Sequence, residues 1–181
     1  MDTFTYEIKI PKDRIAVIIG REGSIKKQLE DDTKTSLKVD SKEGDVFITG
    51  NDALGLYVAR EIIRSIGRGF NPDVALLLLK QDYIFETINL LDYSGKSKET
   101  MLRIKGRVIG KEGKSRKYIE ELTETNISVY GKTIGIIGSA ENVSTAKYAI
   151  ESLLMGSTHS SVYQWLEKKR KQLKRKEMLD L

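Results

Sequence analysis

The sequence predicts an α+β protein built from two related units, and three observations carry this prediction. The stretch around Gly20-Arg21-Glu22-Gly23 returns as Gly110-Lys111-Glu112-Gly113, in the same order and 90 residues later. Each stretch is flanked by the same succession of strand-like and helix-like patterns. The 181 residues leave about 90 for each copy, enough for a modest hydrophobic core. We therefore expect two three-stranded antiparallel sheets, each with helices packed on one face.

The first copy begins with a strand and two helices. Residues 4–10 alternate apolar and polar side chains, which is typical of a strand with one buried face. Pro11 ends this strand. Helical spacing of apolar residues predicts a short helix over 13–19, before the first glycine loop, and another over 24–32, after it.

Two strands and a long helix complete the first copy. Residues 35–39 and 46–50 favour strands, and Glu43-Gly44 between them favours a turn. Asp52 is a good N-cap for the helix that follows, and Gly67 marks its end. This helix has apolar residues at helical spacing: Leu54, Val58, Ile62 and Ile66.

A short linking segment over 71–83 separates the copies. Asn71-Pro72 can start a helix, with Pro at its first position. Residues 74–79 are apolar on every side, so we expect this helix to lie between the two halves, with all its faces buried.

The second copy repeats the first. Residues 84–91 favour a strand, 92–98 a loop, and a helix from about Glu99 leads into Gly110. The later residues match at an offset of 90, with Leu29, Thr33, Thr35, Leu37 and Val39 corresponding to Ile119, Thr123, Thr125, Ile127 and Val129. The two predicted domains are therefore 1–70 and 84–156. Residues 157–181 have no counterpart in the first copy, and we expect them to form a basic C-terminal helix that packs on the second domain through Trp165.

Positively charged residues are clustered in a few segments of the chain. Residues 167–177 hold seven cations and two anions, which accounts for the whole net charge of +5. The rest of the chain carries 24 cations and 24 anions, so a basic surface there depends on clustering. Such clusters surround both glycine loops, with seven cations and one anion over 103–117 and six cations and two anions over 9–27.

The composition excludes several classes of site. The chain has no Cys, which excludes disulfides, thiol catalysis and thiolate zinc sites and suits a reducing cytoplasm. His159 is the sole histidine, so we expect no metal, no cofactor and no general base. No apolar run reaches the roughly 18 residues of a membrane span. We expect a cytoplasmic protein with no membrane partner.

An enzyme that uses nucleotides is the main catalytic alternative. Gly113-Lys114-Ser115 imitates the end of a phosphate-binding P-loop, but that motif needs Gly five residues before Gly113, where Val108 stands. Carboxylate pairs such as Asp31-Asp32 and Glu120-Glu121 are most simply solvated helix positions. We therefore expect that the protein is not an enzyme.

The glycine loops fit a phosphate. Glycine adopts positive φ and lets a ligand backbone approach closely. A helix that starts at the second glycine adds free N–H groups and the positive end of its dipole. Gly-x-x-Gly alone is weak, because 15 glycines in 181 residues produce about one match by chance. Two matches in register are a much stronger signal.

This pattern resembles the type I K-homology (KH) domain, βααββα, present twice over about 3–69 and 84–156. The resemblance implies that each loop lies against the backbone of about four single-stranded nucleotides. Residues 105–120 and 159–167 are similar to archaeal two-KH ribosomal-RNA-processing proteins, kin of the eukaryotic partner-of-Nob-one family. That similarity implies binding near the 3′ end of small-subunit rRNA during ribosome biogenesis. The eukaryotic relatives tend to lack the first loop, whereas Gly20 and Gly23 are intact here.

The candidate RNA-binding residues follow from this resemblance and from charge. They are Gly20, Arg21, Glu22, Gly23, Ser24, Lys26, Lys27, Arg107, Ile109, Gly110, Lys111, Glu112, Gly113, Lys114, Ser115, Arg116 and Lys117. Nearby aliphatic side chains either line the groove for the bases or belong to the core: Ile19, Ile25, Leu37, Val108, Ile109 and Ile127. The cations of the tail either contact RNA or are simply solvated.

Two functional hypotheses remain. The first is a single-stranded RNA-binding protein that uses both loops, the second copy binding more tightly because it is more basic. The alternative is a scaffold of ribosome assembly or translation initiation that uses one KH surface for a protein partner.

Overall fold

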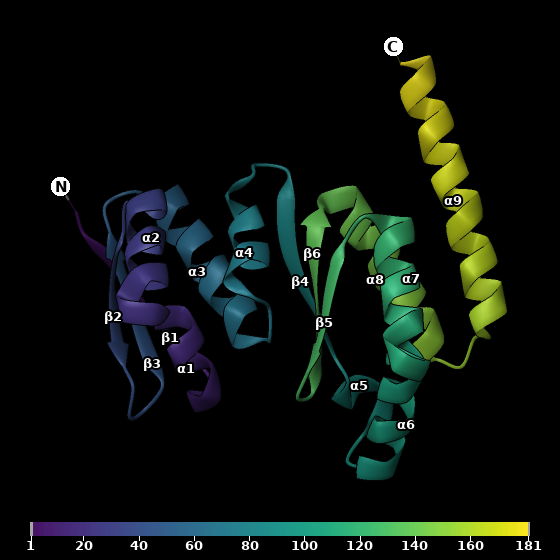
Figure 1. Cartoon of the computed structure of the whole chain (residues 1–181), viewed down its shortest axis with the longest axis horizontal. Helices are drawn as coiled ribbons and strands as arrows, with labels where there is room; N and C mark the ends of the chain where they lie inside the picture. The colour runs from purple at the N-terminus through teal and green to yellow at the C-terminus, as the bar shows by residue number, and fades with distance from the viewer. Residues whose placement is uncertain (1, 181) are drawn as a thin grey trace. The chain divides into compact units, whose positions relative to one another are not determined.

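The computed structural model describes residues 2–180, which divide into two compact units between Tyr83 and Ile84. The first unit (Figure 1) contains β1 (Phe4–Lys9), α1 (Lys12–Ile19), α2 (Ser24–Thr33), β2 (Ser36–Asp40), β3 (Asp45–Gly50) and α3 (Ala53–Gly67), then α4 (Pro72–Ala75) and a 3₁₀ turn, Leu76–Leu79. The second contains β4 (Tyr83–Asn89), α5 (Leu91–Ser94), α6 (Lys98–Ile109), α7 (Lys114–Thr123), β5 (Asn126–Tyr130), β6 (Thr133–Ser139), α8 (Ala140–Leu154) and α9 (His159–Leu179).

Both sheets have the same topology. Their strand orders are β1-β3-β2 and β4-β6-β5, so the last strand of each unit lies in the middle. Leu37 and Tyr6 both pair with Ile48 in the first sheet, and Ile127 pairs with Ile136 in the second. The predicted α+β class and the duplication are confirmed.

The helices of each unit cover one face of its sheet (Figure 1), and each unit has its own buried core. In the first, the fully buried side chains include Ile18, Leu29, Ile48 and Ile62. In the second, the corresponding cluster includes Ile119, Ile134, Ile136 and Ile150. The helical spacing of apolar residues explains these cores, because it places them on the one face of each helix that packs on the sheet.

Two local predictions were wrong. The expected loop over 92–98 begins inside a short helix, α5, whose first turn is fixed by buried Leu90 and by the hydrogen bond from Leu91 N to Asn89 Oδ1 at 3.1 Å. The apolar segment 74–79 does not bury every face, because Leu79 is 40% exposed. Ala75 and Leu78 are buried, and this segment packs against α3 of the first unit.

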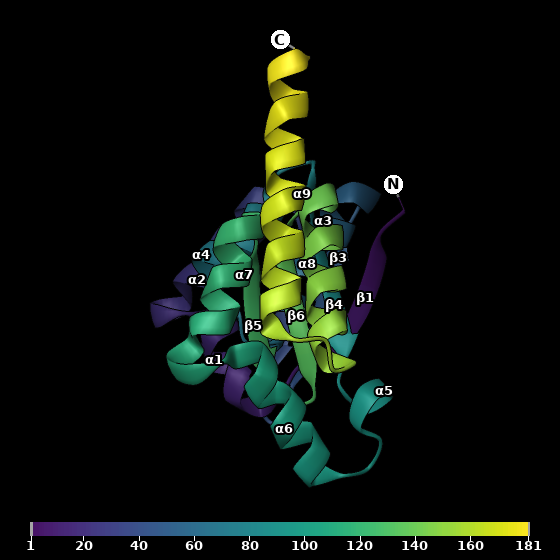
Figure 2. The same ribbon diagram turned by 90° about the vertical axis from the view of Figure 1, so that its right-hand side faces the viewer.

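The predicted basic C-terminal helix is present as α9, which lies along α7 and α8 and extends beyond both (Figure 2). Thr158 caps it, since its hydroxyl accepts a hydrogen bond from Ser161 N. Val162 and Leu166 are buried in the second core. Trp165 packs against Tyr148 of α8, with 4.6 Å between ring centroids and 41° between the ring planes. No helix of residues 2–180 is long and apolar enough to cross a membrane.

Candidate functional site

The two glycine loops have nearly identical backbones. Gly20 and Gly110 both have φ 74°, with ψ 176° and 175°. Gly23 and Gly113 are left-handed, with φ/ψ of 76°/13° and 74°/12°. The glutamates before them also have positive φ, at 54° and 56°. The duplication therefore extends to loop conformation, and both units present the same geometry to a ligand.

The first glycine of each loop is required by packing. A Cβ atom on Gly110 would lie 2.6 Å from Ser115 Cβ and 2.7 Å from Ser115 N. A Cβ atom on Gly20 would lie 2.8 Å from Ile25 N. Real Cβ atoms essentially never come so close, so each loop can fold over its helix only with glycine at this position.

The second glycine of each loop is open. A Cβ atom on Gly23 would meet nothing within 4 Å, and one on Gly113 would only touch Arg116 Nη2 and Lys117 Cε at 4.0 Å. Neither α2 nor α7 has a side-chain cap. The first N–H of each helix, on Ser24 and on Lys114, donates to Arg21 O and Lys111 O, so the next N–H groups of the first turn are the ones open to an anion. The open glycine is therefore the place where a ligand backbone can approach.

Most of the predicted loop cations face solvent. The exposed ones are Arg21, Lys27, Lys111, Lys114 and Lys117, and Ser24, Glu22 and Glu112 are exposed with them. Lys26, Ile109 and Arg116 are half-buried. A phosphate at either loop would meet several mobile ammonium or guanidinium groups, each able to move to it at little cost.

Arg107 is engaged inside the protein. Its guanidinium donates hydrogen bonds to Leu153 O, at 3.1 Å, and to Ser157 O, while its own carbonyl accepts one from His159 Nε2 at 2.7 Å. Arg14 does the same in the first unit, with Ile66 O and Phe70 O. These arginines hold the carboxyl ends of α3 and α8, so the structure commits the Arg107 guanidinium to the fold.

Ser115 is buried beneath its loop, next to Gly110. It is 3% exposed, and its Oγ has no hydrogen-bond partner among the described residues. Ile25 occupies this position in the first unit. The two loops thus differ in what supports them, although their backbones agree.

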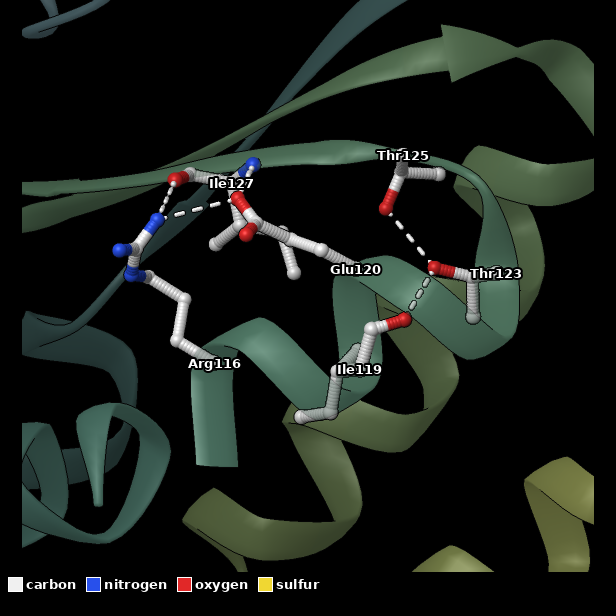
Figure 3. A network of polar contacts seen from close by, with 6 residues as sticks. All are labelled: Arg116, Ile119, Glu120, Thr123, Thr125 and Ile127. Atoms are coloured by element: carbon white, nitrogen blue, oxygen red, sulfur yellow. Dashed lines mark hydrogen bonds and ion pairs between the residues drawn. The ribbon is translucent and has the colours of Figure 1, made fainter. Parts of the chain in front are cut away.

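Glu120 joins the helix after the second loop to strand β5 (Figure 3). Its Oε1 accepts hydrogen bonds from Ile127 N at 2.8 Å and from Arg116 Nη1 at 3.1 Å, and Arg116 also donates to Ile127 O at 3.2 Å. Glu30 Oε1 binds Leu37 N at 2.7 Å in the first unit. The interpretation of Glu120 as a solvated carboxylate was therefore wrong.

Sequence reasoning had a signal for these two glutamates. Glu30 and Glu120 repeat at the offset of 90, as do the hydroxyls beside them. Thr123 Oγ1 lies 2.7 Å from Ile119 O and 2.8 Å from Thr125 Oγ1 (Figure 3), and Thr33 makes the same contacts at 2.6 and 2.7 Å. When the same polar residue stands at equivalent positions of both copies, it indicates a structural role that the two units share.

Glu120→Ala is expected to lower the free energy of unfolding of the second unit by about 1–3 kcal/mol, because it leaves Ile127 N–H without a partner. Trp165, the single tryptophan, lies in this unit, so its fluorescence during urea unfolding measures the change. Glu121→Ala removes the same charge from an exposed neighbour and should change stability by less than about 0.5 kcal/mol. Equal losses in the two variants would contradict this role of Glu120.

The aliphatic candidates separate into two groups. Val108 is fully buried, and Leu37 and Ile127 are 3% and 4% exposed, so these three belong to the cores. Ile19, Ile25 and Ile109 are only half-buried and lie next to the loops. Among the candidates, these last three are the ones that remain accessible to a base.

No group of three or more His, Asp or Glu side chains in the described chain could hold a metal ion.

Comparisons with known proteins agree with this architecture. Residues 5–65 match the model of the KH domain, and residues 84–171 match that of the eukaryotic type KH domain, type I. A KH domain-containing protein of Methanocaldococcus jannaschii is 48% identical over 172 residues, covering 93% of this chain and 75% of that protein. The pre-rRNA-processing protein PNO1 of Phaeosphaeria nodorum is 30% identical, covering 72% of this chain and 50% of its own length.

A solved structure is similar over nearly the whole chain. It is the complex of a/eIF2alpha, aDim2p and rRNA from Pyrococcus horikoshii, with a TM-score of 0.88 and 44% identity. The match covers 94% of this chain and 96% of that one.

Proposed function

The chain belongs to the family of two-KH-domain RNA-binding proteins that includes archaeal Dim2p and eukaryotic PNO1, and on this premise we propose that it binds the 3′-end region of small-subunit rRNA through both glycine loops. The observation that carries the proposal is the matched pair of loops. Each has an open second glycine, uncapped N–H groups at the start of the next helix and exposed cations. Together these features suit the sugar–phosphate backbone of unpaired RNA.

The choice of rRNA draws on the relatives. One similar protein was solved with rRNA, and another is called a pre-rRNA-processing protein. This chain spans about half of the latter, so its role in processing is part of the proposal. Crosslinking the chain to RNA in its own cells and sequencing the bound fragments tests it. Fragments dispersed over unrelated transcripts, with none from the small-subunit 3′ end, would overturn the assignment.

Binding is expected to depend on salt through the cations of the second loop. The logarithm of the affinity for a single-stranded octamer should fall linearly with the logarithm of the salt concentration. The slope of this line should be about −0.7 for each phosphate that the protein neutralises. Replacing both Lys111 and Lys114 with Gln should therefore reduce that slope by about 1.4. Filter binding at several salt concentrations measures it. The variant Lys42→Gln/Lys132→Gln loses the same charge from exposed turns and should keep the original slope.

A protein partner is a second candidate, because one similar structure is a complex that also contains a/eIF2alpha. In this alternative, one KH surface holds a protein of ribosome assembly or initiation. Co-purification after nuclease treatment separates the two: a partner held by protein contacts survives digestion, and one held through RNA is lost. The proposal also assigns the chain no catalytic step, since its sequence contains no catalytic constellation. It places the protein in the cytoplasm, since a chain without Cys suits a reducing compartment.

A further inference from the structure

The glycine loops leave the strongest run of positive charge in the chain unexplained. It lies in the second half of α9, where three exposed cations, Lys168, Lys171 and Arg175, follow one another at spacings of three and four residues. This spacing puts them on one face of the helix. Val162 and Leu166, which are buried, lie on the opposite face. We call the three cations the α9 stripe, and it spans about 10 Å along the helix axis.

The protein itself does not neutralise this stripe. None of the three cations forms an ion pair with a carboxylate of residues 2–180. Glu167, the nearest acidic residue in the helix, accepts a hydrogen bond from the Tyr118 hydroxyl, which raises the pKa of Tyr118. Arg170 and Lys174 differ from the stripe, because they line a cleft together with two carboxylates, Glu124 and Glu177.

The helix dipole explains only part of the charge. Cations stabilise the last turn of a helix, which accounts for positions such as Lys176. Lys168 and Lys171 lie in the middle of α9, where the helix dipole stabilises a cation only weakly. Like charges three and four residues apart repel each other and weaken the helix. The stripe therefore costs stability in the free protein, a cost that a polyanion would remove.

The stripe is carried by an anchored helix rather than by a loose tail. Tyr163 packs edge-on against Tyr118 of α7, with 4.7 Å between ring centroids, and Trp165 packs at a tilt against Tyr148 of α8. His159 binds the carbonyl of Arg107, three residues before the second loop. The base of α9 is thus tied to the helix that leads into the glycine loop.

The same contacts place the stripe at a distance from the loop. Tyr163 lies beside Tyr118 near the middle of α7, and Arg170 and Lys174 line a cleft with Leu122 and Glu124 at its end. The two helices therefore run in the same direction (Figure 2). The loop precedes α7, whereas the stripe lies towards and beyond its far end. An RNA that reaches both must extend past the roughly four nucleotides of one KH groove.

We propose that the α9 stripe binds the phosphate backbone of RNA flanking the single-stranded segment held by the second loop, without reading its sequence. This inference rests on the proposed function and extends its binding surface beyond the KH fold. Lysine and arginine on an exposed helix face contact phosphates through charge and release counterions. No aromatic side chain lies on this part of the helix face, so base stacking is not expected there.

The test compares three RNAs and two variants of the full chain. One RNA is a single-stranded hexamer that fills a groove. The others carry the same hexamer joined to a ten-base-pair hairpin at its 5′ or its 3′ end. Lys168→Gln/Lys171→Gln/Arg175→Gln removes the stripe and keeps good helix formers. Lys42→Gln/Lys96→Gln/Lys132→Gln is the control, because it removes three exposed cations elsewhere.

With at least one of the hairpin RNAs, the stripe variant is expected to bind on the order of tenfold more weakly, with a log–log salt slope lower by about 2–3. Its affinity for the hexamer, and the affinities of the control variant for all three RNAs, should stay within about twofold of those of the unmodified chain. Unchanged hairpin binding, an equal loss in the control, or an equal loss with the hexamer would overturn the inference. Failure of the unmodified chain to bind the hexamer would instead overturn the proposed function.

Discussion

Gly113→Asp is expected to weaken single-stranded RNA binding on the order of thirtyfold, about 2 kcal/mol. Aspartate tolerates the left-handed conformation of this position better than most residues, and a side chain here meets nothing closer than 4.0 Å. The fold is therefore kept. The new carboxylate lies where a phosphate would approach, and like charges brought together at an interface cost several kcal/mol.

The matched variants separate charge from shape. Gly113→Asn has the same size and backbone preference but no charge, so it should lose much less affinity than Gly113→Asp. Gly23→Asp should also lose less, because fewer cations surround the first loop. Filter-binding titrations at one fixed salt concentration give all three values. Equal losses at Gly23 and Gly113 would contradict the ranking of the loops, and no loss at either would contradict RNA binding through them.

Gly110→Ala is expected to have the largest effect on stability, lowering the free energy of unfolding of the second unit by about 3 kcal/mol or more. The backbone at φ 74° and ψ 175° belongs to a region that essentially only glycine occupies, which costs other residues about 1–3 kcal/mol. The added methyl group would also overlap Ser115, at 2.6 Å from its Cβ. Urea unfolding followed by Trp165 fluorescence measures the loss.

Gly106→Ala is the control for this prediction. Gly106 lies in α6, four residues before Gly110, and a Cβ atom there would meet nothing within 4 Å. Alanine stabilises a helix interior relative to glycine, so this variant should gain up to about 1 kcal/mol. If Gly110→Ala proves as stable as Gly106→Ala, the structural role assigned to the first glycine of the loop is wrong.

The two glycines of one loop thus have different roles. A substitution at Gly110 is expected to weaken binding by destabilising the unit, whereas one at Gly113 is expected to weaken binding and leave the unit folded. Thermal melts run beside each titration distinguish these cases. The sequence motif treats the two positions alike, and the backbone conformation and the contact with Ser115 separate them.

The candidate site could be predicted only in part. The sequence shows that cations gather at both loops, but it does not show which of their side chains are exposed. The prediction that Arg107 contacts RNA did not foresee that its guanidinium donates to Leu153 O and Ser157 O, 46 and 50 residues away. Glu120 was expected in solvent and instead binds Ile127 N. A charge pattern gives no sign of such partners, because they come from distant parts of the chain.

The sequence by itself determined the duplication, nearly every helix and strand and the position of both loops. These features depend on local causes: the periodicity of apolar residues, the Pro and Gly that end elements, and the missing Cβ that permits positive φ. Tertiary structure alone decided which glycine is open, which cations are free and which aliphatic side chains are core. Those properties depend on which atoms the fold brings within a few ångströms, and a side chain such as Arg107 has no fixed role until α8 ends beside it.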